Sequence, residues 1–448
     1  MTAANRTVAL RPRAVLVSCV FFYICAYIVA YAFLLAPLFA YFGLGLTQPV
    51  DPLRIAAPAI LALAPAFWLP LRMEKPSTFL FSVQYYIVYV PGCFVAFLST
   101  RPALPFGQSL LLALTLLLGL AILLVGQRAL PLLRLPRFAA PGAIYWIAFC
   151  AVALTLMVTI AAKLGGNFQL AGIDEIYDVR AAGSERLGGN VLLVYALNWL
   201  NALVLPFVMA YALFARRKFL LLVVAACYVF LFGVWGSKAS LLAPIFISLI
   251  YLLVRQRADR VSWLLPLGLA AIILSPALIP TPNDLMQLAR DWAVQIVPQR
   301  TFSSSALLIV QYLEFFTVNP NTFGSHVSVV REFLPDVYPA AIAPTIGWYT
   351  YGGPMTANAN FWATDGIAGF GLPGIPMLSV ICALVFWLLD SATRHVAPSF
   401  SIVAMAYIGT NFADTGLFTT LLTGGLLFLV LLLHLVPIDF RFLRTAQS

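Results

Sequence analysis

Long apolar stretches alternate along the chain with short segments that are polar or basic. About twelve of these stretches are long enough to cross a bilayer as α-helices. The predicted spans are 14–43, 54–71, 78–98, 109–126, 142–162, 191–214, 219–235, 240–254, 262–279, 367–389, 397–411 and 416–436. The connections are short except for 163–190 and 281–366. The pattern therefore predicts an all-α polytopic membrane protein, with 1–448 as a single membrane domain that carries two large loops.

The basic residues divide unevenly between the two sides that this alternation defines. Seventeen of the 26 Lys and Arg residues fall on one set of ends. By the positive-inside rule that side is cytoplasmic, so both termini are predicted to lie inside and both large loops outside. The other nine basic residues then lie on the outer side: Arg54, Arg101, Lys163, Arg180, Arg186, Lys238, Arg290, Arg300 and Arg331. Because topology disfavours cations there, they indicate an anionic substrate on the outer face.

The composition limits the class of protein. Hydrophobic residues make up 62% of the chain and charged residues 9%, which excludes a soluble protein and a disordered one. The net charge of +10 follows the predicted topology, so it needs no nucleic acid partner and favours contact with anionic membrane lipids. The six Cys residues lie in apolar runs and paired Cys/His spacing is absent, so no disulfide, no metal site and no cofactor are predicted.

The second large loop has helical and irregular parts. In 283–296 the apolar residues, including Leu288 and Trp292, share one stripe, which predicts an amphipathic helix on the outer interface. Residues 303–316 are a second, apolar helix candidate with a single acid, Glu314. The remainder is rich in Pro, Gly, Tyr and Trp, a composition typical of a packed lid rather than a disordered linker.

Two short motifs carry cations suited to phosphate. Tyr177-Asp178-Val179-Arg180 lies in the first large loop, and an arginine fork binds phosphate or pyrophosphate through paired hydrogen bonds. The alternative is an Asp–Arg pair that only fixes local structure. Gly236-Ser237-Lys238 forms a tight turn between two spans, where a lysine at membrane depth indicates function. The alternative is a side chain that extends to the outer headgroups.

The second large loop holds further charged candidates. Arg300 has a rigid, partly apolar setting and ranks first among its arginines, whereas Arg331 is adjacent to an acid and Arg290 can simply contact lipid headgroups. His326 is the one outer histidine, and it is either structural or a base. Glu314, on an apolar helix, is the carboxylate whose pKa desolvation is expected to raise most.

Amides and aromatic rings gather at the end of the same loop. Tyr351 is followed by Asn360 and Trp362, which lead into Asp365. Amides bind sugar hydroxyls and ring faces bind their C–H surfaces, so this segment is a candidate sugar site. The alternative is an aromatic belt at the membrane interface combined with helix caps.

In these features the chain resembles the bacterial oligosaccharide repeat-unit polymerases of the Wzy-type O-antigen polymerase family. The likeness covers roughly residues 170–390. It rests on the long late loop, the Tyr177–Arg180 motif, the Gly236–Lys238 turn, and Asn360 followed by the glycines of Gly369–Gly374. The resemblance implies a GT-C-like fold in the bacterial inner membrane and glycan transfer on its periplasmic face.

The resemblance also implies substrates and roles. Donor and acceptor are expected to be undecaprenyl pyrophosphate-linked oligosaccharides, used without a nucleotide sugar or a metal, and a chain-length regulator is a further candidate partner. The groups expected to neutralise the departing pyrophosphate are Arg180, Lys238, Arg300 and Arg331, with Arg290 ranked below them. The groups expected to orient the acceptor hydroxyl and take its proton are Asp178, Glu314, His326 and Asp365. The expected substrate contacts are Tyr177, Tyr351, Asn360 and Trp362.

Two other functions stay open at this point. An O-antigen ligase shares the topology and also needs outer arginines and a histidine, for which His326 qualifies. A flippase or another transporter places polar residues within spans and at broken helices, and Asn198, Asn201 and Asn411 are the main polar residues within the predicted spans. Charges gather at the outer surface instead, which favours surface chemistry over transport.

Overall fold

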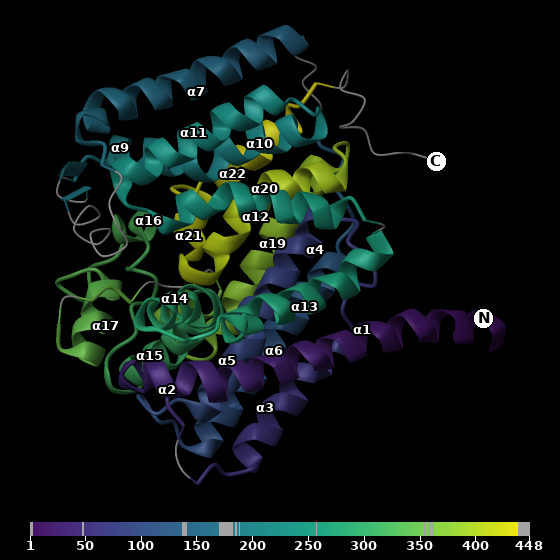
Figure 1. Ribbon diagram of the computed structural model, residues 1–448, viewed down its shortest axis with the longest axis vertical. Helices are drawn as coiled ribbons and strands as arrows, with labels where there is room; N and C mark the ends of the chain where they lie inside the picture. The colour runs from purple at the N-terminus through teal and green to yellow at the C-terminus, as the bar shows by residue number, and fades with distance from the viewer. Residues whose placement is uncertain are drawn as a thin grey trace.

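The computed structural model describes residues 3–46, 49–136, 141–169, 182–183, 186–187, 189–256, 258–353, 355–357, 360 and 362–437. Throughout these residues the chain is helical and contains no strand. The prediction of an all-α protein is therefore confirmed for this part of the chain. Figure 1 shows the helices gathered into one bundle, most of them running roughly parallel or antiparallel to one another.

The α-helices follow the apolar stretches of the sequence. The first half of the chain contains α1 (Ala3–Ala30), α2 (Ala36–Phe39), α3 (Leu53–Leu63), α4 (Pro76–Val83), α5 (Val90–Leu98), α6 (Phe106–Ala129), α7 (Gly142–Leu164), α9 (Val191–Trp199), α10 (Leu205–Phe214) and α11 (Lys218–Trp235). The second half contains α12 (Lys238–Val254), α13 (Ala258–Leu274), α14 (Asp284–Val294), α15 (Ser304–Val318), α16 (Ser328–Arg331), α17 (Ile342–Tyr351), α18 (Ala363–Phe370), α19 (Gly374–Thr393), α20 (Pro398–Asp414), α21 (Leu417–Leu421) and α22 (Leu426–His434). Short 3₁₀ turns lie at η2 (Ala40–Phe42), η3 (Ala64–Phe67), η5 (Gly165–Asn167) and η7 (Ser275–Leu278).

Several helices contain a π-helical segment. Within the described residues these are η1 (Tyr31–Leu35), η4 (Gln84–Tyr89), η6 (Leu200–Val204) and η8 (Gln295–Ser303). A proline follows two residues after each of the first three, at Pro37, Pro91 and Pro206, and the fourth contains Pro298. A proline ring clashes with the carbonyl four residues earlier, and for the first three prolines that carbonyl belongs to the π segment. The wider turn accommodates the proline without ending the helix, and such bulges often occur at functional sites.

Ten helices among the described residues are long and apolar enough to cross a membrane. They are Pro12–Phe42, Pro76–Leu98, Phe106–Ala129, Gly142–Leu164, Val191–Phe214, Lys218–Trp235, Arg260–Leu278, Asp284–Val318, Gly374–Thr393 and Leu417–His434. All except Asp284–Val318 coincide with predicted spans. The predicted spans 54–71 and 240–254 appear as shorter apolar helices, and 397–411 lies within α20. A multi-pass membrane architecture is thus supported, with ten long apolar helices where about twelve spans were predicted.

The second large loop is more deeply integrated than the sequence predicts. Its two helix candidates join through η8 into one helix, Asp284–Val318, and α15 packs against α5 and α18. In Figure 1 α14 is seen almost end-on, whereas α1, α7 and α11 run across the view, so this helix enters the bundle crosswise. Hydropathy alone could not separate a crosswise helix from a surface helix, because Arg290 and Asp291 lower the apolar character of its first part.

The predicted span 367–389 is broken in the structure. α18 ends at Phe370 and α19 begins at Gly374, and Gly371 between them has a positive φ of 64°. A Cβ atom on Gly374 would lie 1.9 Å from the carbonyl oxygen of Gly366, so only glycines permit this approach of α18 to α19. The chain therefore folds back on itself where the sequence predicts a straight span.

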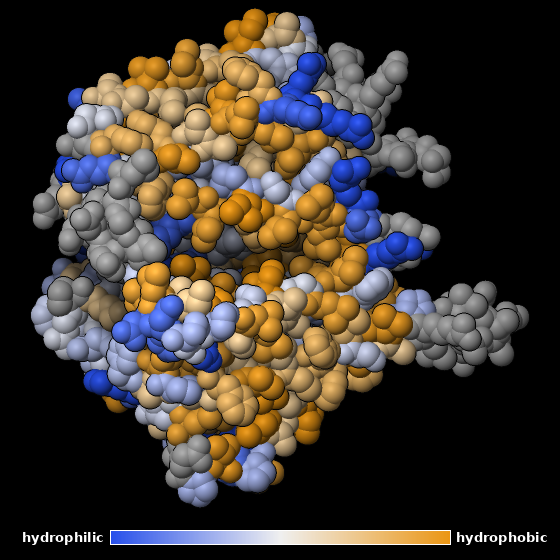
Figure 2. Space-filling model, viewed as in Figure 1, coloured by the Kyte–Doolittle hydropathy of each residue, from blue (hydrophilic) through white to orange (hydrophobic). Residues whose placement is uncertain are grey.

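One end of the bundle, here called the basic face, collects the ends that the sequence marks as basic. The guanidinium of Arg13 donates to the carbonyl of Leu69 at 2.5 Å, which joins the start of the first long helix to the end of the second apolar segment. His434, the last residue of α22, lies 3.0 Å from the carbonyl of Pro136 at the same end. The N-terminal end of α1 projects on this side of Figure 1, and Figure 2 shows strongly hydrophilic patches there beside a broad apolar body.

The opposite end, here called the loop face, carries α14, α16 and α17 (Figure 1). The turn after α5 also lies there, since the N–H of Thr100 donates to the carbonyl of Gly43 at 3.0 Å and Arg101 donates to the carbonyl of Thr350 at 3.2 Å. Most of the candidate site residues lie on or near the loop face.

Candidate functional site

The turn between α11 and α12 directs Lys238 toward the crosswise helix. Gly236 ends α11 in a left-handed conformation (φ 66°), and its N–H donates to the carbonyl of Phe232 at 2.7 Å. Glycine adopts this geometry without a steric penalty. α12 begins at Lys238, whose ammonium lies 4.0 Å from the centre of the Trp292 ring in α14. The aromatic face therefore holds a cation at the start of α12.

Arg300 lies on the same crosswise helix, about two turns beyond Trp292. Its guanidinium is 3.4 Å from the carboxylate of Asp414, the last residue of α20. The two side chains are 54% and 40% exposed, so the pair contributes little to stability. Arg300 is thus held in place at one point while much of its guanidinium stays accessible to another anion.

Tyr407 connects this ion pair to the start of α12. Its hydroxyl accepts a hydrogen bond from the amide of Asn201 at 2.7 Å, and it interacts with the Ser240 hydroxyl and with the charge of Asp414. Ser240 is one of the first residues of α12, two positions after Lys238. These residues are here called the cationic ring, which consists of two contacting pairs, Lys238 with Trp292 and Arg300 with Asp414, together with Tyr407 and Ser240.

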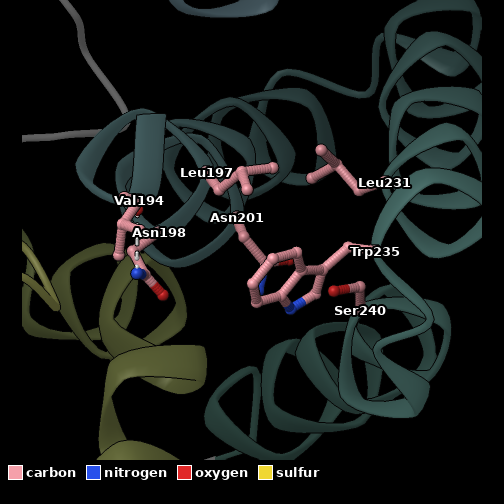
Figure 3. A pocket seen from close by; sticks show the side chains of 7 residues that line it. All are labelled: Val194, Leu197, Asn198, Asn201, Leu231, Trp235 and Ser240. Carbon is pink, nitrogen blue, oxygen red and sulfur yellow. Dashed lines mark hydrogen bonds between the residues drawn. The ribbon is translucent and has the colours of Figure 1, made fainter. Parts of the chain in front are cut away.

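A pocket adjoins the cationic ring between α9, α11 and α12 (Figure 3). It is lined by Val194, Leu197, Asn198, Asn201, Leu231, Trp235 and Ser240. Figure 3 shows the side chains of Asn201 and Ser240 beside the indole of Trp235. The Oδ1 atom of Asn201 is buried and has no hydrogen-bond partner among the described residues. An indole face with amides and a hydroxyl is a combination that suits a sugar ring.

His326 and Asp365 form a second, more buried part of the site. The Nε2 atom of His326 lies 3.8 Å from Oδ1 of Asp365, and the side chains are 13% and 8% exposed. Nδ1 of His326 is 2.6 Å from the hydroxyl of Thr322, whose single proton is donated to the carbonyl of Ala368 at 2.9 Å. With the Thr322 proton directed to Ala368, Nδ1 carries the histidine proton in this bond, and Nε2 is then the acceptor in neutral histidine. Nε2 has no hydrogen-bond partner among the described residues.

A short segment joins the two parts. Asp414 faces Arg300, and three residues later the N–H of Leu417 donates to Oδ2 of Asp365 at 2.6 Å. Three residues extend over at most about 11 Å. Gly416 lies against the same carboxylate, and a Cβ atom there would come within 2.9 Å of both carboxylate oxygens. The segment 414–417 therefore contacts Arg300 at one end and Asp365 at the other, although these two residues come from distant regions of the sequence.

The remaining loop arginines lie apart from this arrangement. The guanidinium of Arg331 pairs with Asp336, through Nε at 2.9 Å, and the two side chains are 59% and 39% exposed. Arg290 is half-buried in α14 and takes part in no hydrogen bond or ion pair within the described residues. Neither contacts the cationic ring in the part of the chain that the structure describes.

Asn360 and Trp362 are fully buried. The Oδ1 atom of Asn360 accepts from the N–H groups of Ala363 at 2.8 Å and Thr364 at 3.2 Å, so it caps α18. The indole of Trp362 donates to Ser379 at 2.5 Å and is packed against α6 and α19. In this conformation both residues have the structural roles that the sequence offers as the alternative to sugar binding.

Tyr351 and Glu314 lie together at another place on the loop face, between α15 and α17. The phenol of Tyr351 accepts from the amide of Gln311 at 2.5 Å, and Glu314 stands one turn beyond Gln311 on the same helix. Arg101 carries a positive charge close to both. These residues therefore form a polar cluster that is separate from the cationic ring.

Tyr177, Asp178 and Arg180 lie outside the described residues, so the structure does not place this motif. Among the residues that are described, no group of three or more His, Cys, Asp and Glu side chains could hold a metal ion.

Several members of the site were not singled out from the sequence. Trp292 was seen only as part of an apolar stripe, Trp235 was the last residue of the predicted span 219–235, and Asp414 lies between the predicted spans 397–411 and 416–436. The signal for Trp235 and Asp414 is position, since both lie at or next to the outer end of a predicted span. Comparison with protein families, with curated proteins and with solved structures finds no match to this chain.

Proposed function

We propose that the chain is a glycosyltransferase that polymerises lipid-linked oligosaccharide units. It transfers a glycan from an undecaprenyl pyrophosphate donor to a second lipid-linked unit, on the periplasmic face of the bacterial inner membrane. The product is an O-antigen, a capsule or an exopolysaccharide. In this proposal the fold is GT-C-like, the loop face is periplasmic, and both termini are cytoplasmic.

The proposal rests mainly on the cationic ring and the pocket beside it. Lys238 contacts Trp292 of the crosswise helix, and Arg300 lies about two turns farther along that helix, paired with Asp414. A pyrophosphate leaving group gains negative charge as its bond to the sugar breaks, so two preorganised cations stabilise the transition state more than the ground state. The pocket with Trp235 and the two amides is suited to the sugar that bears this leaving group.

His326 supplies the proton acceptor in this mechanism. The acceptor hydroxyl forms a bond to the anomeric carbon of the donor, while the bond from that carbon to the pyrophosphate oxygen breaks. The hydroxyl proton passes to Nε2 of His326, and the carboxylate of Asp365 stabilises the resulting imidazolium. No nucleotide sugar and no metal enters this reaction, because the pyrophosphate link already activates the donor.

The test uses purified protein in liposomes with lipid-linked oligosaccharide extracted from the producing bacterium. We expect a ladder of lengthening glycans without added nucleotide sugar and in the presence of EDTA. Lys238→Ala and Arg300→Ala are each expected to lower the transfer rate by about 10²- to 10³-fold, the effect of removing one preorganised charge-stabilising group.

Lys163→Ala is the matched control, because Lys163 is an exposed cation at the end of α7. Within the described residues it makes no contact with the cationic ring. It should elongate at the wild-type rate. The proposal is overturned if both ring variants elongate normally, or if EDTA stops elongation and a divalent metal restores it.

A transporter of lipid-linked oligosaccharide is the second candidate, and broken helices favour it. α18 is interrupted before α19, and α21 is interrupted before α22 at Gly425, which has a positive φ of 81°. Transporters use such breaks to expose helix ends to a substrate within the membrane. The same liposomes decide between the two: rapid crossing of a fluorescent lipid-linked unit without a glycan ladder would establish transport instead.

A further inference from the structure

A second polar cluster lies on the loop face, away from the cationic ring. It consists of Arg101, Gln311, Glu314, Thr350 and Tyr351 and is called the Tyr351 cluster below. Gln311 and Glu314 come from α15, Thr350 and Tyr351 from the end of α17, and Arg101 from the turn after α5. The amide of Gln311 donates to the Tyr351 hydroxyl at 2.5 Å, and Arg101 donates to the carbonyl of Thr350 at 3.2 Å.

Several polar atoms of this cluster have no partner. Oε1 of Gln311 and Oγ1 of Thr350 are buried and make no hydrogen bond among the described residues, although Gln311 is 0% and Thr350 only 7% exposed. Burial raises the pKa of the Tyr351 phenol, so its hydroxyl keeps a proton. Unsatisfied buried groups are uncommon in folded proteins. The cluster thus contains an unpaired acceptor and an unpaired hydroxyl, which a ligand that both donates and accepts hydrogen bonds would satisfy.

Aromatic rings extend this cluster to the protein surface. The ring of Tyr351 stacks on Phe42 with a centroid distance of 5.0 Å and an interplanar angle of 27°. Phe42 in turn meets the edge of Tyr41 at 6.2 Å, and Tyr41 is 71% exposed. Rings beside amides and hydroxyls bind the C–H faces and the hydroxyls of sugars.

The charges at the edge of the cluster distinguish it from the cationic ring. Arg101 is exposed and Glu314 is partly exposed, and the two charges are close enough to interact. A pyrophosphate held here would face the Glu314 carboxylate, which repels it. A neutral or mixed polar ligand such as a carbohydrate, in contrast, can accept hydrogen bonds from the guanidinium and donate to the carboxylate.

The position of the cluster excludes direct contact with the reacting bond. Gln311 follows Arg300 by eleven residues along the crosswise helix, which corresponds to roughly 16 Å of helix length. Glu314 is one turn farther. A ligand that touches both places must therefore be extended, as an oligosaccharide chain is.

We propose that the Tyr351 cluster is a glycan-holding site, which binds sugar residues of the growing chain at a distance from the reaction centre. This inference rests on the proposed function, since it assumes that the cationic ring is where transfer occurs. By retaining the polymer between transfers, the site favours repeated elongation of one chain over its release. Its loss shortens the product without slowing the individual transfer step.

The test compares product length with the rate of the first transfer in the liposome assay. Tyr351→Phe keeps the ring on Phe42 and removes the hydroxyl, and Arg101→Gln removes the charge. Each is expected to reduce the most abundant chain length by at least about twofold, while the first transfer stays within about twofold of wild type. Tyr349→Phe is the matched control, since Tyr349 lies on the same helix with 48% of its surface exposed.

Each outcome decides the inference. Wild-type chain length in both variants overturns it, and so does a first transfer that slows as much as chain length falls, because the residues would then belong to the reaction centre. If the wild-type protein makes no polymer, the proposed function fails instead. The glycan-holding site is then judged by binding to a printed array of bacterial glycans, where retention of wild type and loss in Tyr351→Phe support it and no retention of wild type overturns it.

Discussion

The ammonium of Lys238 lies 4.0 Å from the centre of the Trp292 ring, although the two residues are 54 positions apart and belong to helices of different orientation. A lysine at the end of an apolar helix would otherwise extend to the headgroups. The indole holds the charge in the protein instead, beside the pocket of Figure 3. This contact gives the ammonium a defined partner within the protein.

Replacement of Trp292 tests this positioning role. A cation–π contact contributes about 0.5–2 kcal/mol, so Trp292→Ala is expected to weaken binding of farnesyl pyrophosphate by roughly two- to thirtyfold. Trp292→Phe should retain most of the affinity. Calorimetry on the detergent-solubilised protein measures both, with Trp68→Ala as control because Trp68 is 55% exposed and lies at the basic face. Equal affinities for all three variants would show that the indole does not position the ammonium.

Replacements of Arg300 and of Asp414 are expected to change the affinity for farnesyl pyrophosphate in opposite directions. Arg300→Gln removes a cation and should weaken binding of farnesyl pyrophosphate, whereas Asp414→Asn removes the competing anion and should strengthen it. Because both side chains are about half exposed, neither change is expected to alter the melting temperature by more than a few degrees. Salt should reduce both effects, since exposed charges are screened. Weaker binding in Asp414→Asn would mean that the carboxylate is needed to orient the guanidinium.

Replacement of His326 tests whether this residue acts in the transfer step or in substrate binding. If Nε2 takes the acceptor proton, His326→Gln lowers kcat by about 10²- to 10⁴-fold and leaves affinity for farnesyl pyrophosphate unchanged. Asp365→Asn keeps an oxygen for the N–H of Leu417 and removes the charge, so it should lower kcat with little effect on folding. Transfer rates measured across pH complete the test, because the wild-type dependence on one ionisation should disappear in His326→Gln. An unchanged pH profile would assign His326 a structural role.

Most of the fold could be predicted from the sequence, but few of the contacts that bring the candidate site residues together could be. Alternating apolar runs predicted which chain ends meet, because burial of apolar surface fixes the length and spacing of the helices. The same measure did not show that the predicted helices 283–296 and 303–316 join into one crosswise helix, and it missed the break at Gly371. Both depend on packing against distant segments, which hydropathy does not describe.

The candidate site could be predicted only as a set of residue types. Lys238, Arg300 and His326 were singled out because charge on the outer side of a membrane protein is uncommon. Their partners were not, since Arg300 meets Asp414 across 114 positions and no local spacing relates the two. For Asn360 and Trp362 the local pattern fits both sugar binding and a structural role, because an amide before a helix can also cap that helix.

The prolines that follow the π segments allow the link between backbone and site to be tested. Pro206 forces the widened turn of η6, and that segment contains Asn201, which lines the pocket and donates to Tyr407. Pro206→Ala restores an N–H and removes the clash with the carbonyl of Ala202, so the segment can return to α-helix. We expect the melting temperature to stay equal or rise, while the Asn201 amide rotates out of the pocket and the transfer rate falls by tenfold or more. Pro266→Ala is the matched control, because Pro266 lies within α13 without a π segment and away from the pocket. It should gain stability and keep its rate, and a similar loss of rate in both variants would show that the π turn itself has no role in positioning Asn201.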